Sequence, residues 1–309
     1  MKTAWIFTGQ GSQRPGMGAD MYERFPEFAQ VIEQAEAEFP GLKHLMFEDD
    51  GTALSATCHT QPALAAFAAG VVAVLRSSGL KPDAAAGLSL GEYSALYAAG
   101  VLDLNSLIRL TAFRGAAMQR AAEQSDGCMS AVIGLDAGTI REICAEVCAS
   151  CGGVVSPANY NAPLQTVIAG ERIAVELAEE RLRAAGARRC ARLRVSGAFH
   201  TELMRPAAWE LHDYMKTVSF GKPLFPVFSN VTARPAETAE EIPDLLEQQV
   251  TAPVRMTEIL HNLATAGITR VIEIGPGNAI AGFVRRTERE MKVCSIDSAE
   301  DLRNIVCAI

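Results

Sequence analysis

The chain has 309 residues, of which 49% are hydrophobic and 21% charged, a composition typical of a globular protein. Its net charge of −8 argues against a nucleic-acid-binding protein, because such proteins usually carry a basic excess. The length exceeds that of a typical single core, so we expect a large domain and a smaller one.

The first part of the chain has the pattern of an α/β domain. We expect, in order, a strand at 3–8, a Gly-rich turn at 9–13, helices at 20–38 and 61–77, a strand at 82–87, and helices at 92–99 and 104–122. Between the second strand and the helix after it, the chain must turn sharply at Ser89.

The middle of the chain has a different pattern, which predicts a small inserted domain. We expect strands at 129–135, 154–159, 165–169 and 189–195, and helices at 137–150 and 171–185. The order β-α-β-β-α-β is typical of a ferredoxin-like α+β unit. We therefore expect this small domain at 126–194.

The remaining segments return to the first pattern. We expect helices at 202–217 and 256–266, and strands at 225–229 and 270–274. The sequence thus predicts an α/β fold, with a large hydrolase-like domain of residues 1–125 and 195–309 built on a parallel sheet.

No segment has the pattern of a membrane anchor. The apolar run at 4–7 is too short for the core of a signal peptide, and the run at 63–75 fits a buried helix and is too short to cross a bilayer. We expect a cytoplasmic protein without a membrane partner, and therefore mostly buried, reduced cysteines.

Three of the eight cysteines are closely spaced. Cys144, Cys148 and Cys151 have a C-x3-C-x2-C spacing similar to that of an iron–sulfur site. They lie at the end of an expected helix, however, and Cys144 and Cys148 share an apolar face with Ile140 and Val147, which favours packed helix cysteines.

The segment 87–91 has the pattern G-x-S-x-G, between a buried strand and an Ala-rich helix. In that context the pattern predicts a nucleophile elbow, which presents the hydroxyl of Ser89 beside a helix N-terminus. The alternative is a capping box, in which Ser89 caps the helix and Glu92 completes the motif.

A serine nucleophile needs a base, and the chain has five histidines, none in a zinc-binding spacing. His200 follows the small domain in a loop of small residues, so it is a candidate that competes with the others. The Gly-rich turns at 9–13 and 275–277 lack the features of phosphate loops, so we expect no nucleotide cofactor and no metal. The amides of 9–13 instead predict a donor-rich loop near the elbow.

Several motifs occur together in one order. They are Gly9-Gln10-Gly11-Ser12-Gln13, Thr60-Gln61-Pro62-Ala63, the segment from Gly87 to Ala95, Arg114, Gly197-Ala198-Phe199-His200 and Glu273-Ile274-Gly275-Pro276-Gly277. The ordered set resembles the malonyl-CoA:acyl carrier protein transacylase family of fatty acid and polyketide synthesis, over nearly the whole chain.

The resemblance implies roles for particular residues. Ser89 would be the acylated nucleophile, His200 its base and acid, and the Gln10 and Leu90 amides the oxyanion hole. The main-chain carbonyl of Gln249 would orient the histidine, although the adjacent Gln248 leaves the register open. Polar positions lining the family's cleft match Gln61, Asn159, Asn161 and Asn230.

Arg114 matches the arginine that pairs with the malonyl carboxylate in this family; without the resemblance it would be read as a solvated helical arginine. A guanidinium binds a carboxylate bidentately, and an acetyl group would leave it unpaired, at a cost of about 3–5 kcal/mol if it is well buried. Phe199 resembles the malonyl-selecting version of its motif. Leu88 stands where many members have histidine, and Thr8 replaces a common proline.

The resemblance implies malonyl-CoA and the holo acyl carrier protein as substrates, no cofactor, and a monomer. A carrier protein is acidic, so we expect a basic docking patch, either Arg188, Arg189, Arg192 and Arg194 or Arg285, Arg286 and Arg289, unless these are simply solvated.

Three other interpretations remain open. One is a polyketide-pathway acyltransferase that acts in trans. Another is a serine esterase or thioesterase, which normally needs an acid between serine and histidine, where Asp103, Asp126 and Asp136 lie. The third is a non-catalytic module in which Ser89 only caps a helix.

Overall fold

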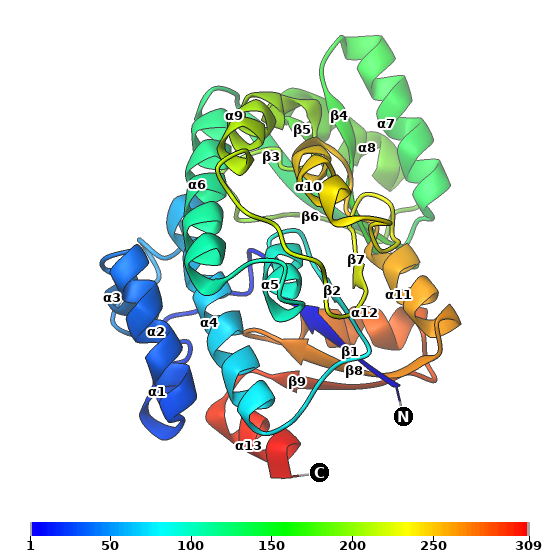
Figure 1. Cartoon of the computed structure of the whole chain (residues 1–309). Coiled ribbons are helices and arrows are strands. Elements are labelled where there is room, and N and C mark those ends of the chain that lie inside the picture. The colour runs from blue at the N-terminus through cyan, green and yellow to red at the C-terminus, as the bar shows by residue number, and fades with distance from the viewer. Residues whose placement is uncertain (1, 308–309) are drawn as a thin grey trace.

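The computed structural model describes residues 2–307, and two β-sheets organise them (Figure 1). The larger sheet has five parallel strands in the order β7-β2-β1-β8-β9. Its strands are β1 (Lys2–Phe7), β2 (Ala84–Gly87), β7 (Val227–Phe228), β8 (Ile268–Ile274) and β9 (Lys292–Ile296).

The central strand β1 contributes to a separate core on each face of this sheet. Trp5 and Phe7 belong to one core, whereas Ala4 and Ile6 belong to the other. This division follows from the two-residue period of a strand. Because both faces are covered, the strand is apolar at every central position, as is typical of parallel sheets.

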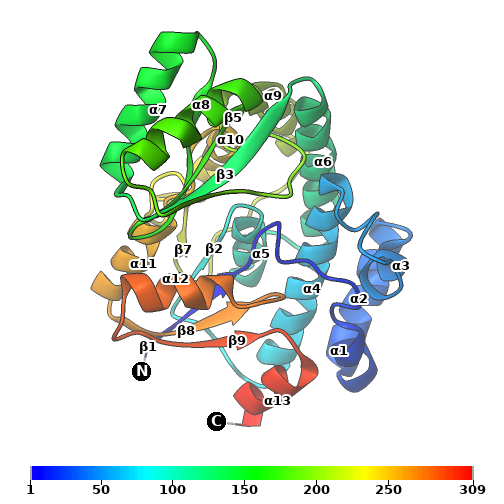
Figure 2. The same cartoon turned by 180° about the vertical axis from the view of Figure 1, so that it is seen from behind.

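Helices cover both faces, as Figures 1 and 2 show. The first core includes α1 (Ala19–Arg24), α2 (Pro26–Glu38), α3 (Leu42–Phe47), α4 (Thr57–Ser77), α5 (Gly91–Ala98), α6 (Leu104–Glu123), α9 (Arg205–Met215), α10 (Ile242–Thr251) and α13 (Ala299–Cys307). The second core includes α11 (Met256–Thr265) and α12 (Ala279–Thr287).

Helix α4 is the one helix in the described part of the chain that is long and apolar enough to cross a membrane. However, 83% of its most apolar window is buried inside the protein. Its apolar residues, including Phe67, Val71 and Leu75, pack in the first core. Helix α4 is therefore a core helix.

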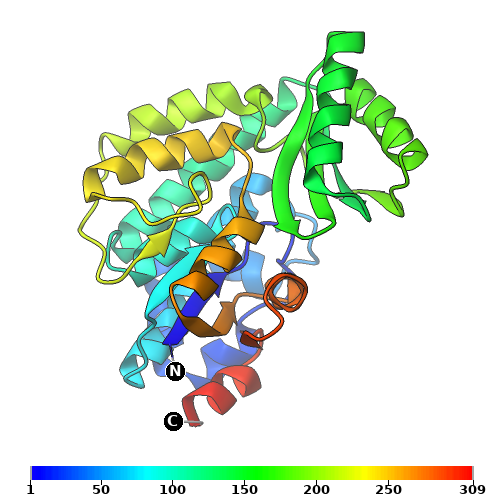
Figure 3. The same ribbon diagram turned by 90° about the vertical axis from the view of Figure 1, so that its right-hand side faces the viewer.

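The second sheet is antiparallel, with the strand order β4-β5-β3-β6 (Figure 3). Its strands are β3 (Gly127–Ile133), β4 (Val155–Ala162), β5 (Gln165–Glu171) and β6 (Arg189–Arg192), and its helices are α7 (Ala137–Cys151) and α8 (Arg172–Ala184). The two helices cover one face, where Val132 and Ile168 are buried. On the other face Met129 and Val167 pack in the first core. The face that carries Met129 and Val167 therefore packs toward the main body of the protein.

The predicted α/β class is confirmed as a mixed architecture with a parallel sheet and a separate antiparallel sheet. Several predicted bounds differ. The helix expected at 20–38 is interrupted before Pro26, where α2 begins, and α4 begins at Thr57 and continues through Pro62. The helices α3, α10, α12 and α13 and the strand β9 were not predicted.

Candidate active site

Ser89 lies in the tight turn between β2 and α5, with φ of 53°, a left-handed conformation that is uncommon for a non-glycine residue. The flanking glycines are required by space. A Cβ on Gly87 would lie 1.9 Å from the carbonyl carbon of Gly91, and one on Gly91 would lie 2.3 Å from the Phe7 oxygen. The turn therefore has the geometry of a nucleophile elbow.

The capping-box alternative for Ser89 is wrong. Helix α5 begins at Gly91 and has no side-chain cap. The carboxylate of Glu92 accepts hydrogen bonds from the main-chain N–H of Asn230 (2.9 Å) and from Nε2 of Gln249 (2.7 Å) instead. Because the hydroxyl of Ser89 does not cap α5, it is available for another partner.

That partner is His200, whose Nε2 lies 2.8 Å from Oγ of Ser89. The other ring nitrogen, Nδ1, donates to the main-chain oxygen of Gln249 at 2.8 Å. This carbonyl can only accept, so it places the proton on Nδ1 and leaves Nε2 free to accept the serine proton. The structure thus brings together the three groups that the resemblance had paired, and Gln249, not Gln248, holds the orienting position.

The loop 9–13 approaches the elbow closely. A Cβ on Gly9 would lie 2.3 Å from the carbonyl oxygen of Leu88, so only glycine allows this approach. Within residues 2–307, the main-chain N–H groups of Gln10 and Leu90 donate no hydrogen bond to another protein group. Free donors beside a serine nucleophile suit a developing oxyanion.

Arg114, on α6, is 1% exposed and points at the serine. Its guanidinium donates to Oε1 of Gln61 (2.8 Å), Oε1 of Gln249 (2.9 Å) and Oγ of Ser89 (3.2 Å), and it lies over the ring of Tyr93. In the described part of the chain it has no carboxylate partner and its Nε has no hydrogen-bond partner. A buried guanidinium held by neutral groups alone is prepared to bind an anion.

These groups surround a cavity of about 160 Å³. Its lining includes Ser89, His200, Arg114, Gln61, Gln10, Phe199, Asn159, Asn161 and Leu88, and apolar walls of Met118, Met129, Val167, Leu193 and Val195. The buried Oδ1 of Asn161 has no partner within the described residues and adds a free acceptor to this lining.

The resemblance placed Asn230 in the lining of the cleft. In the structure it does not line the cavity but contacts the main chain of the turn at Ser89. Its Oδ1 accepts from the N–H of Ser89 at 2.7 Å, and its Nδ2 donates to the carbonyl oxygen of Gly87 at 2.7 Å. Asn230 therefore holds the strained turn. A buried asparagine satisfied on both sides costs little to bury and fixes one conformation.

Burial controls the ionisation of this site. Desolvation, together with the nearby charge of Arg114, lowers the pKa of His200 to about 4. Desolvation also raises the pKa of Glu92 to about 7 and that of Tyr93 to about 12, and it lowers the pKa of Arg114. His200 is therefore neutral at physiological pH and is able to act as a base.

The carboxylates that a hydrolase triad would need are engaged elsewhere. Asp103 and Asp136 cap the N-termini of α6 and α7, and Asp126 pairs with Arg172. The ring nitrogen that a triad acid would contact instead faces the Gln249 carbonyl. The site is thus a Ser–His pair oriented by a main-chain oxygen.

The closely spaced cysteines lie on α7. Cys144 is buried, with burial raising the pKa of its thiol to about 12, Cys148 donates to the oxygen of Val155, and Cys151 is exposed. The three thiols therefore occupy different environments, with Cys144 in the core beneath α7 and Cys151 exposed.

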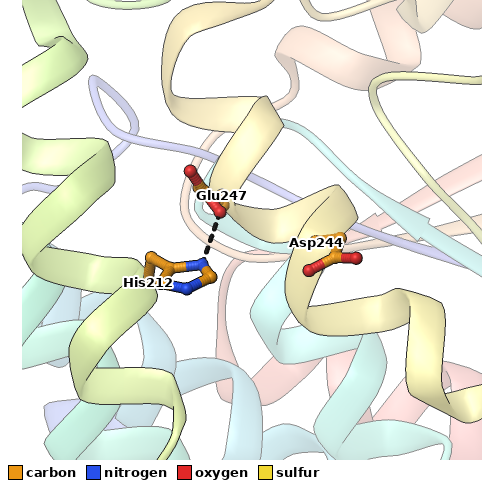
Figure 4. Close-up of side chains that lie close together, drawn as sticks. All are labelled: His212, Asp244 and Glu247. Atoms are coloured by element: carbon orange, nitrogen blue, oxygen red, sulfur yellow. Dashed lines mark hydrogen bonds and ion pairs between the residues drawn. The ribbon is translucent and has the colours of Figure 1, made fainter.

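One group of side chains in the described region has metal-ligand character, His212 on α9 with Asp244 and Glu247 on α10 (Figure 4). Nδ1 of His212 lies 2.6 Å from Oε2 of Glu247. None of the three lines the Ser89 cavity. Their contact ties α9 to α10 near Gln249.

Sequence reasoning missed Glu92 as part of the site, because its place in the motif also fits a helix cap. It missed Tyr93 beneath Arg114, although the residue stood in the motif. The walls Met129 and Val167 carried no signal, because apolar strand residues look alike whichever face they occupy.

Comparisons with known proteins agree with this geometry. The model of a family described as "Acyl transferase domain" matches residues 4–302. The malonyl CoA-acyl carrier protein transacylase of Bacillus subtilis (strain 168) is 38% identical over 97% of this chain and 95% of its own length. That of Escherichia coli (strain K12) is 40% identical over 92% of each.

A solved structure described as a type II polyketide acyl carrier protein in complex with its malonyl-transacylase is 38% identical, covers 100% of both chains and has a TM-score of 0.96. Sequence and structure agree over essentially the whole chain. The chain therefore is an acyltransferase and belongs to the malonyl CoA-acyl carrier protein transacylases.

Proposed function

We propose that this enzyme transfers a malonyl group from malonyl-CoA to the phosphopantetheine thiol of an acyl carrier protein, through a malonyl ester of Ser89. The observation that carries the proposal is the position of Arg114, a buried cation 3.2 Å from the nucleophile with no anionic partner of its own in residues 2–307. An acyl group that carries a carboxylate supplies that anion.

In the first step, Nε2 of His200 takes the proton of the Ser89 hydroxyl, and Oγ attacks the thioester carbonyl carbon. The amides of Gln10 and Leu90 stabilise the oxyanion of the tetrahedral intermediate. The C–S bond then breaks, and His200 returns the proton to the CoA sulfur. The malonyl ester of Ser89 remains.

In the second step, the thiol of the carrier protein gives its proton to His200, and its sulfur attacks the ester carbonyl. The C–O bond to Ser89 breaks, and Oγ recovers the proton. One site thus serves both substrates in turn, which is a ping-pong sequence. The chemistry needs only these protein groups, so no cofactor is invoked.

Selection of the acyl group rests on Arg114. Gln61 and Gln249 each accept from a different terminal nitrogen, which fixes the plane of the guanidinium. A malonyl carboxylate forms a bidentate ion pair with the Arg114 guanidinium, which compensates both groups for their lost hydration. An acetyl group leaves the guanidinium unpaired in a closed pocket. Phe199, beside His200, limits the space near the acyl chain.

We propose that the carrier protein docks at the basic residues in and beside β6, namely Arg188, Arg189, Arg192 and Arg194. Leu193 and Val195 line the Ser89 cavity, and Arg194 between them is exposed, as are Arg188 and Arg189. Arg192 is already paired with Glu176 and Glu179. The alternative cluster, Arg285, Arg286 and Arg289, lies on and beyond α12, whose residues do not line this cavity.

We further propose that residues 126–194 form a ferredoxin-like domain inserted into a hydrolase-like domain of residues 1–125 and 195–309. The strand order β4-β5-β3-β6, with two helices on one face, supports this division. We also propose that the enzyme acts in the cytoplasm as a monomer. A polyketide carrier is a second candidate acceptor, since one similar structure contains such a carrier protein.

The test is a transfer assay with malonyl-CoA and holo carrier proteins of fatty acid and polyketide type. We expect malonyl transfer to a carrier to exceed release of free malonate. Release of malonate that is as fast with carrier as without it would instead indicate a thioesterase.

A further inference from the structure

Gln249 connects the separate parts of the active site. Its main-chain oxygen accepts from His200, its side-chain Oε1 accepts from Arg114, and its Nε2 donates to the carbonyl oxygen of Ser89 (3.0 Å) and to Oε2 of Glu92 (2.7 Å). The side chain is fully buried. The orientation of its side-chain amide therefore decides whether Arg114 faces the oxygen or the nitrogen of that amide.

The surroundings permit one orientation of this amide. A guanidinium can only donate, so Oε1 must face Arg114; a carbonyl only accepts, so Nε2 must face Ser89 and Glu92. Of the acceptors around Nε2, Oε2 of Glu92 is the closest, and Oδ1 of Asn230 is the farthest at 3.5 Å. Glu92 is itself fixed by the N–H of Asn230.

We propose that Glu92 is a positioning residue for acyl selection, which sets the orientation of the Gln249 amide and, through it, the aim of the Arg114 guanidinium. The inference rests on the proposed function, because it concerns how Arg114 meets a carboxylated acyl group. Glu92 does not line the Ser89 cavity, and its hydrogen bond to Gln249 is the link through which it orients Arg114.

This role differs from general support of the elbow. If Glu92 only stabilised the fold, its loss would slow every acyl transfer equally. If it aims Arg114, its loss selectively slows transfer of malonyl, whose carboxylate needs the guanidinium, and spares acetyl. Removal of the closest acceptor of the buried Gln249 amide should lower the ratio of kcat/KM for malonyl over acetyl about tenfold to a hundredfold.

The experiment compares kcat/KM for malonyl-CoA and acetyl-CoA in the full-length enzyme, with Glu92→Leu and Glu92→Gln. Leucine removes the acceptor, whereas glutamine keeps a carbonyl oxygen for Gln249 and Asn230. We expect Glu92→Leu to lower the malonyl-to-acetyl ratio and Glu92→Gln to recover most of it. Labelling of Ser89 by a fluorophosphonate should continue in both variants.

A matched control is Glu273→Leu on β8. Glu273 is also buried and accepts from the N–H groups of Ile280 and Ala281, far along the chain from the elbow. The Glu273→Leu variant should have a lower melting temperature and an unchanged malonyl-to-acetyl ratio of kcat/KM. If Glu92→Leu slows both acyl groups equally, or if Glu92→Gln does not recover the ratio, the positioning role is wrong. Absence of malonyl transfer by the wild-type enzyme would instead overturn the proposed function.

Discussion

Nε2 of His200 lies 2.8 Å from Oγ of Ser89, although 111 positions separate the two residues in the chain. Both residues have positive φ, 53° for Ser89 and 62° for His200, so the backbone is strained on both sides of this contact. The surrounding structure, mainly Asn230 at the serine and the Gln249 carbonyl at the histidine, holds them in place.

The acid limb of the acylation rate should reflect the burial of His200. Only the neutral imidazole accepts the serine proton, and its pKa is lowered from 6.5 to about 4. The rate of Ser89 acylation, measured by rapid quench, should therefore stay constant as pH falls through 6.5 and should drop near pH 4. A decline in the acylation rate centred near pH 6.5 would contradict the lowering of the His200 pKa by burial.

The same shift predicts how stability depends on pH. In the unfolded chain this histidine takes up a proton near pH 6.5, and in the folded protein only near pH 4. At this residue the unfolded state therefore binds more protons between these values, so the contribution of His200 to the free energy of unfolding should fall as pH falls from 6.5 towards 4. Urea unfolding of His200→Gln should show a smaller decline, whereas His44→Gln, a change at an exposed site, should retain it.

Replacement of Ser89 by alanine should abolish acylation while leaving the fold intact. Among residues 2–307 no other hydroxyl is hydrogen-bonded to His200, so we expect transfer to fall at least about 1,000-fold. Intact-protein mass spectrometry after incubation with malonyl-CoA should show one malonyl adduct on the wild type and none on Ser89→Ala. An adduct on the variant would exclude Ser89 as the nucleophile.

Replacement of Arg114 by alanine should reduce the preference of the enzyme for malonyl over acetyl groups. The variant loses the bidentate partner of the carboxylate, so malonyl transfer should fall about 100-fold or more, and acetyl transfer should rise relative to it. Arg114→Lys should recover only a part, because an ammonium cannot reproduce the planar pair. Competition between the two acyl-CoA substrates measures the change; an unaltered preference would remove Arg114 from the substrate site.

The elbow should not accept a methyl group at Gly91. A Cβ there would lie 2.3 Å from the main-chain oxygen of Phe7, so Gly91→Ala should displace the turn and cost about 1–3 kcal/mol of stability, with loss of activity. Gly282→Ala in α12 is the control, because its Cβ would meet only the flexible end of Arg286 at 3.2 Å. Thermal unfolding should show a lower midpoint for the first variant and no comparable loss for the second.

Reversal of charge at Arg194 should weaken use of the carrier protein. Arg194 is exposed between two residues that line the cavity, so Arg194→Glu should raise the KM for an acidic carrier several-fold and leave the KM for malonyl-CoA unchanged. Arg289→Glu, at the other basic cluster, serves as the control. An equal effect of both variants would indicate a general charge effect rather than docking.

Much of the site could be predicted from the sequence because its chemistry sits in short motifs with local geometric demands. Gly9, Gly87 and Gly91 permit close approaches that no other residue allows, and those constraints are visible in the chain itself. The contact of His200 with Gln249 was accessible only through family resemblance, since no local pattern links a loop histidine to a helical carbonyl.

Other features depend on tertiary structure alone. Glu92 fitted a helix cap locally, and only the approach of Asn230 and Gln249 reveals where its carboxylate goes. Likewise Asn230 matched a cleft position by motif, but the fold places it against the back of the turn. The strand β9 has five residues and the helix α13 nine, and elements this short give a weak signal in the sequence, so their place in the first core was not predicted.

The cavity takes its reactive groups from outside the antiparallel sheet, whereas two of its walls, Met129 and Val167, belong to that sheet. Neither wall residue contributes a hydrogen bond to Ser89, His200 or Arg114 through its apolar side chain. Acyl-chain length and acid–base chemistry are consequently separable. Smaller side chains at Met129 and Val167 should enlarge the range of accepted acyl groups and leave the hydrogen bonds of Ser89 and His200 unchanged.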